Sequence, residues 1–385
     1  MDWPDLPTRL AGGTVIAALS LIAFALMLTL STAALSVAIA VMIVIAALID
    51  RRLDMPWLGL FIQLAVAVLG WRFLIDPGIP WASWWKTPLW EVALGYAVPL
   101  ALMGVAWWVM RPIKRLGAQL ALESAVWSLG AVFALILLER ALRSDIDSFW
   151  GFSLAGSILL ISMGAQLYRW HKGVRFAWVL VPLASLLGLL GFGVLLTALV
   201  GMAPIMSWGA RDIAGPLLLD TIAIAYLAPT GVLAVLVWKL DHIHRYLRAA
   251  FAGLSALMGV AYIAIEIRRF WQGEQIASDA ISQGELYSHT IAMMLGAVRL
   301  LFFALVRRSD LLRKLAMVGI AVTIAKVFLI DMSGLNGLVR VASFLGLGLA
   351  LTGLAWLNRA MSARWNPEDS AQEQNANEVG PSSST

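Results

Sequence analysis

Charged side chains inside the apolar stretches of this chain are the residues whose type and spacing could support chemistry. They recur near one end of successive hydrophobic segments and comprise Arg72, Glu91, Glu139, Arg140, Asp220, Glu266, Arg268, Lys326, Asp331 and Arg340. An ionisable group inside a membrane-spanning helix is costly, so it usually has a partner or a function. These positions are therefore candidates for a polar cavity that binds a substrate. Alternatively, they form interhelical salt bridges and helix caps that fix the packing of the helices.

Other kinds of site have less support in the sequence. The chain has no cysteine and only four histidines, so we expect no metal and no cofactor. Gly188, Gly191 and Gly193 resemble a dinucleotide-binding pattern, but they lie in an apolar segment where glycines allow close helix contacts. The carboxylates have no nucleophile or glycine-rich phosphate loop beside them, so no catalytic residue is assigned and an enzyme is not favoured.

The composition identifies the elements that must position these charges. Of the 385 residues, 61% are hydrophobic and 13% are charged, against about 45–50% and about 25% in soluble domains. A soluble fold could not cover so much apolar surface, whereas a bilayer removes that requirement. The net charge of +5 fits basic cytoplasmic loops, and we expect no nucleic acid partner.

The apolar segments predict an all-α integral membrane protein, because a span needs roughly 20 apolar residues. Twelve segments meet this length: 10–30, 33–49, 57–75, 89–110, 116–138, 149–168, 176–200, 217–238, 249–266, 286–306, 313–331 and 337–357. The first two are interpreted as retained helices, since the apolar run is too long for a signal peptide. Residues 1–361 then form one membrane domain, and the polar stretch 362–385 is predicted to be a disordered cytoplasmic tail.

The basic residues of the loops orient these twelve segments. With a cytoplasmic N-terminus, 18 Lys and Arg residues fall on the inside, 6 on the outside and 4 within spans. Cytoplasmic loops collect Lys and Arg, so this division predicts that both termini are cytoplasmic. The charged residues of the spans then lie mostly at the outer end.

Matching sequences indicate an internal repeat. The stretch from Glu91 aligns without gaps with the stretch from Arg340, and RFLID from Arg72 matches KVFLID from Lys326. The helices ending ILLER and IAIEI also match, and the match makes Glu139 and Glu266 equivalent positions of the repeat. We predict three parallel four-helix units over about 10–110, 116–238 and 249–357. Pro99 and Pro229 inside the fourth helices are candidates for helix breaks.

The C-terminal third resembles a known family. IEIRRFWQG from Ile265, GELYSH from Gly284 and AKVFLIDMSGLNGLVRVASFLGLG from Ala325 are similar to the domain of unknown function 2339 family of bacterial membrane proteins. The resemblance implies a multi-pass protein of the bacterial inner membrane. It supplies no catalytic residues to transfer to this chain.

These observations leave three functions open. The first is a transporter-like protein of the cell envelope that binds an anionic or lipid-linked substrate at a polar site near the outer face. The second is a membrane scaffold without a substrate, and the third is a membrane-embedded transferase acting on a lipid-linked envelope substrate. Membrane lipids are expected partners in each case, while protein partners stay open.

Overall fold

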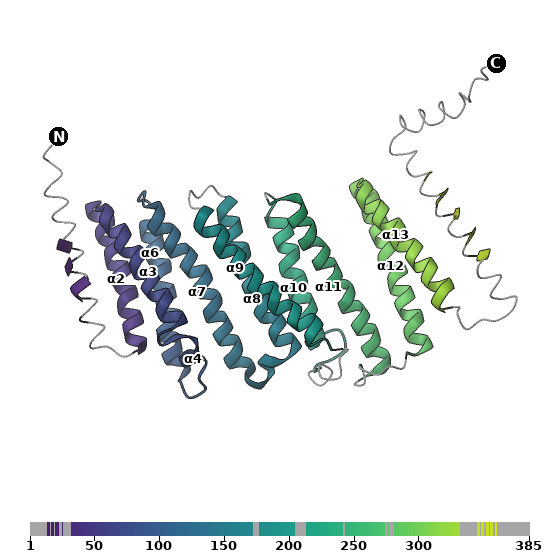
Figure 1. Ribbon diagram of the computed structural model, residues 1–385, viewed down its shortest axis with the longest axis horizontal. Coiled ribbons are helices and arrows are strands. Elements are labelled where there is room, and N and C mark those ends of the chain that lie inside the picture. Colours follow the sequence, from purple (N-terminus) through teal and green to yellow (C-terminus); the bar gives the residue numbers. More distant parts are fainter. Residues whose placement is uncertain are drawn as a thin grey trace, which may run out of the picture. The chain divides into compact units, whose positions relative to one another are not determined.

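Over the residues that it describes, the computed structural model consists mainly of α-helices (Figure 1). It describes residues 32–171, 177–204 and 213–331, apart from 242, 274–275 and 277–280, with short pieces between 14 and 25 and between 345 and 359. Two compact units divide the chain, Met1–Tyr262 and Ile263–Thr385, and the boundary falls within one helix.

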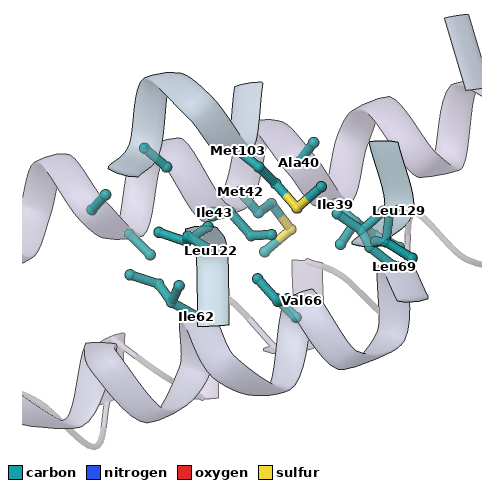
Figure 2. Packing of buried hydrophobic residues seen from close by; sticks show 14 of the residues in the cluster. Ile39, Ala40, Met42, Ile43, Ile62, Val66, Leu69, Met103, Leu122 and Leu129 are labelled. Atoms are coloured by element: carbon teal, nitrogen blue, oxygen red, sulfur yellow. The ribbon is translucent and has the colours of Figure 1, made fainter. Parts of the chain in front are cut away.

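The first unit begins with helices that pack around a shared apolar core. They are α2 (Thr32–Leu53), α3 (Pro56–Leu74), α4 (Gly78–Ser83), α5 (Leu89–Val92), the π-helical turn η2 (Ala93–Ala97), α6 (Val98–Met110) and α7 (Leu116–Leu142). Proline at the first position of α3 suits a helix start, because its missing N–H would be unpaired there. Figure 2 shows the core side chains, which include Ile39 and Ile43 of α2, Ile62 and Leu69 of α3, Met103 of α6 and Leu122 of α7.

The first unit continues with the 3-10 turn η3 (Arg143–Asp147), α8 (Phe149–His171), α9 (Ala177–Leu196), the π-helical turn η4 (Thr197–Gly201), α10 (Thr221–Lys239) and the start of α11 (Arg245–Gln272). Glycines bring α8 and α9 close together. A Cβ at Gly156 would lie 2.7 Å from Cγ of Leu195 and 3.0 Å from the carbonyl oxygen of Gly191. Small residues allow such close helix packing in membranes.

The second unit contains the end of α11, α12 (Gln283–Arg307), α13 (Asp310–Lys326) and the π-helical turn η6 (Val327–Asp331). Serine residues cap its helices: Ser282 accepts a hydrogen bond from the N–H of Glu285, and Ser309 accepts one from Leu312. These bonds satisfy N–H groups that a helix start leaves unpaired.

The predicted segments from 33–49 to 313–331 each overlap described helices, although 217–238 begins four residues before α10. In the described part of the chain, nine helices are long and apolar enough to cross a membrane. The segment 313–331 corresponds to α13 and η6, whereas 10–30 and 337–357 lie largely outside the described residues. The helix α10 runs unbroken through Pro229, so the expected break there is wrong. Near Pro99 the chain stays helical, with the turn η2 ending two residues earlier.

Candidate functional site

Arg72 ties two helices of the first unit together. It lies near the end of α3 and is 7% exposed. Its Nε donates to Oγ of Ser36 at 3.2 Å, and its guanidinium also donates to the carbonyl oxygen of Thr32 at 2.8 Å. Both acceptors lie in the first turns of α2. The side chain is therefore held by neutral oxygens within its own unit.

Lys326 makes the same kind of contact in the second unit. Its Nζ, at the end of α13, donates to the carbonyl oxygen of Leu286 at 2.8 Å and to the hydroxyl of Thr290. Both acceptors lie in the first turns of α12. In each case the hydroxyl precedes the cation by 36 residues and the carbonyl precedes it by 40. Arg72 and Lys326 therefore occupy matching positions in two helix pairs.

A buried carboxylate lies beside this contact on α12. Glu285 is 2% exposed, and its Oε1 lies 3.3 Å from the Arg268 guanidinium of α11. Its Oε2 accepts a hydrogen bond from the amide of Gln272 at 2.8 Å. The first two turns of α12 thus contact cations from both α11 and α13. We refer to Arg268, Gln272, Glu285, His289 and Lys326 as the α12 polar site.

The orientation of His289 follows from its neighbour. Its Nδ1 lies 2.8 Å from the carbonyl oxygen of Glu285. A carbonyl oxygen only accepts hydrogen bonds, so Nδ1 must carry the proton. In the neutral imidazole, Nε2 is then the acceptor. The α12 polar site accordingly combines a carboxylate, two cations and an imidazole nitrogen.

The ends of α11 and α12 lie close together where this site forms. The Trp271 ring packs over Gly284, since a Cβ at that glycine would lie 2.3 Å from a ring carbon. The indole N–H of Trp271 donates to Oγ of Ser288 at 3.0 Å. Glycine at position 284 therefore permits the approach that places Arg268 beside Glu285.

Glu266 points in another direction from the α12 polar site. It is 4% exposed and lies two residues before Arg268 on α11. Two residues along an α-helix correspond to a turn of about 200°. The structure therefore separates Glu266 from the face of α11 that contacts Glu285, although the sequence grouped the two positions.

Glu139 and Arg140 lie at the end of α7 and hold the segment around α4. The guanidinium of Arg140 donates to the carbonyl oxygens of Ala82 at 2.7 Å, Trp84 at 3.0 Å and Thr87 at 2.6 Å. Glu139 accepts a hydrogen bond of 2.5 Å from Oγ of Ser83. Both predicted site residues thus form hydrogen bonds with the segment around α4.

The remaining predicted site residues lie at helix ends. Asp220 caps α10 by accepting a hydrogen bond of 2.8 Å from the N–H of Ala223, and Glu91 lies in the first turn of α5. Carboxylates at helix starts are stabilised by the helix dipole without any ligand. Asp331 ends η6, and its side chain lies outside the described residues, as does the whole of Arg340.

Sequence reasoning missed Glu285 and a second network between α7 and α8. There the Arg169 Nε lies 3.0 Å from a Glu123 carboxylate oxygen, and the same guanidinium donates to Ser124 at 2.7 Å. Arg169 also contacts Gln166, which is fully buried. Gln166 and Ser124, polar residues inside apolar segments, were the available signal. The pattern Ser282-x-x-Glu285 is typical of a helix cap, so it did not indicate that Glu285 is buried and paired.

Comparison with known proteins agrees with the helical architecture. A family model described as predicted membrane protein (DUF2339) matches residues 5–361. No curated protein and no solved structure matches the chain. The matched range includes every helix that carries a candidate site. The chain therefore belongs to the DUF2339 family of predicted membrane proteins.

Proposed function

We propose that this membrane protein binds a polar or amphipathic substrate at the α12 polar site, in the manner of a transporter. The single observation that supports the proposal is the buried Glu285, which contacts Arg268 and Gln272 of α11 beside the Lys326 contact from α13. Charged groups within a membrane are rare and usually serve substrate or ion pathways. An anionic or lipid-linked envelope substrate would compete with Glu285 for Arg268, with Lys326 as the second cation of the site.

The membrane arrangement that goes with this proposal has twelve spans in the bacterial inner membrane, with both termini cytoplasmic. In that arrangement the α12 polar site faces the outer side. The distribution of Lys and Arg over the loops supports this orientation.

The repeat helps to separate packing from binding. The matching contacts of Arg72 and Lys326 support a common origin of the first and third four-helix units. The register that pairs Arg72 with Lys326 pairs Ser31 with Glu285. The buried carboxylate is thus an addition in the third unit, beyond the contact that ties the helices together.

A direct test is thermal unfolding of the full-length protein in detergent against a panel of lipid phosphates, lipid-linked sugars and small carboxylates. A ligand at about 100 times its Kd stabilises a protein by about 2.7 kcal/mol. We expect one chemical class to raise the Tm of the wild type. The variant Arg268→Gln/Lys326→Gln should lose that response. The matched control Arg72→Gln, which removes the corresponding cation of the first unit, should retain it.

The proposal fails if no class raises the Tm, or if the double variant responds as the wild type does. A scaffold without a substrate is the second candidate. It is favoured by Arg140, whose donors are occupied by three carbonyl oxygens of the chain. A scaffold predicts that a stable protein partner co-purifies and that the charge variants change only the stability.

A further inference from the structure

The connection between α10 and α11 carries exposed cations beside aromatic rings. Trp238 is 72% exposed, and Nζ of Lys239 lies 4.3 Å from the centre of its ring. At the start of α11, the guanidinium of Arg245 lies 4.9 Å from the ring centre of Tyr246, which is 66% exposed. Tryptophan and tyrosine with neighbouring Lys and Arg are typical of the level of the lipid headgroups.

Arg248 adds a third cation to this connection. Its Nε donates to the carbonyl oxygen of Val237 at 3.0 Å, across from α11 to the last turn of α10. The bond fixes the position of the guanidinium while the side chain stays exposed. Asp241 lies in the same connection. Three cations against this one carboxylate give the connection a net positive charge. We refer to Lys239, Arg245 and Arg248, with Trp238 and Tyr246, as the α10–α11 basic patch.

At two other helix ends of the described chain, cations form ion pairs with carboxylates. Arg115 forms ion pairs with Asp50 at 3.1 Å and Asp54 at 2.6 Å. Burial lowers the pKa of Arg115, but hydrogen bonds and charges of the two carboxylates raise it above its usual value.

At the start of α13, two cations share one carboxylate. Asp310 lies 2.8 Å from Lys314 and 2.6 Å from Arg313, and hydrogen bonds from these two residues lower the pKa of its carboxyl. The cations of the α10–α11 basic patch contact aromatic rings and a carbonyl oxygen instead. Their charge therefore remains available to an anion from outside the protein.

We infer that the α10–α11 basic patch binds the headgroup of an anionic phospholipid. A lipid phosphate can accept hydrogen bonds from Arg245 and Arg248, and the exposed indole of Trp238 suits the boundary between headgroup and acyl chain. The patch lies at the ends of two helices that are long and apolar enough to span the membrane, where a headgroup is always adjacent. The inference is independent of the α12 polar site.

The test measures lipid binding to the full-length protein by native mass spectrometry from detergent. Phosphatidylglycerol and phosphatidylcholine with identical acyl chains are the probes. A Lys or Arg near an anionic surface contributes roughly a factor of five in affinity. The variant Arg245→Gln/Arg248→Gln should therefore bind phosphatidylglycerol about thirtyfold more weakly and phosphatidylcholine unchanged.

Two controls separate charge from position. Arg245→Lys/Arg248→Lys keeps the charge and should retain most of the affinity for phosphatidylglycerol. Lys314→Gln removes a cation that forms an ion pair with Asp310 and should change the affinity less than twofold. If the double glutamine variant does not accumulate, Lys239→Gln alone should weaken binding about fivefold.

Three results would overturn the inference. One is equal affinity of the wild type for the two lipids. Another is an equal loss of affinity in Lys314→Gln and in the patch variant. The third is displacement of phosphatidylglycerol by inorganic phosphate at millimolar concentration, which would identify a site for free phosphate.

Discussion

At the scale of single residues, cations within the spans are held largely by neutral oxygens of neighbouring helices. Arg72 and Lys326 each donate to one carbonyl and one hydroxyl, and Arg140 donates to three carbonyls. A helix carbonyl has a second lone pair, so it can accept such a bond without losing its bond within the helix. A cation can thus tie two helices together through neutral oxygens.

Substitution of Arg72 tests this description. Arg72→Met removes two hydrogen bonds from a charged donor, each worth about 1.5–3 kcal/mol, and leaves Ser36 without this donor. We expect the free energy of unfolding to fall by about 3–6 kcal/mol, measured by denaturant titration in mixed micelles. Arg72→Lys should cost less than about 1 kcal/mol, because Lys326 makes the same contacts. Equal losses in the two variants would show that hydrogen bonding by the cation is not what stabilises this position.

Glu285 distinguishes binding from packing at the α12 polar site. Glu285→Gln keeps an oxygen acceptor and removes the charge that faces Arg268. If the site binds an anionic substrate, this change should enlarge the ligand-dependent rise in Tm, because the substrate no longer competes with Glu285 for Arg268. It should lower the free energy of unfolding by less than about 1 kcal/mol. If the pair serves packing alone, breaking it should cost several kcal/mol, because Arg268 loses a buried partner. Thermal unfolding with and without the ligand separates the two outcomes.

At the scale of helices, hydropathy predicted the long segments well because each must be apolar along its whole length. Hydropathy did not predict the structural features that depend on contacts with neighbouring residues. The short helix α4 and the π-helical turns η2, η4 and η6 arise from local contacts that leave no periodic signal. Glu285 could not be assigned because a capping glutamate and a buried, paired one have the same sequence context. The residues of the site were found only where the charge itself was conspicuous, as at Lys326 and Arg268.

The contact between α8 and α9 gives a prediction about helix packing. Gly156→Ala places a Cβ against Leu195 and against the backbone of α9, which cannot yield as a side chain does. Overpacking of this kind costs about 1–3 kcal/mol. Gly130→Ala in α7 is the control, because its Cβ meets no atom within 4 Å and alanine favours a helix by about 1 kcal/mol. Denaturant titration should therefore show opposite signs for the two substitutions. A loss of stability in Gly130→Ala would contradict this interpretation.

At the scale of the whole molecule, the number of spans determines on which side each loop and terminus lies. The described residues contain nine helices that qualify as spans, whereas the sequence predicts twelve. The difference involves α13 and the segments 10–30 and 337–357. Each additional span reverses the side of everything that follows it, so accessibility of a few positions distinguishes these counts.

The chain lacks cysteine, so single cysteines can report the side without any background substitution. Lys86→Cys follows the third predicted span, and Asp241→Cys follows the eighth. Ser383→Cys lies in the C-terminal tail beyond the twelfth. We expect a membrane-impermeant maleimide to label only Lys86→Cys in intact spheroplasts and all three after permeabilisation. Labelling of Ser383→Cys in intact spheroplasts, with Asp241→Cys protected, would mean that an odd number of spans follows α10. In that case the third unit could not be a complete four-span copy of the first, although the helix pairs that carry Arg72 and Lys326 would still be parallel.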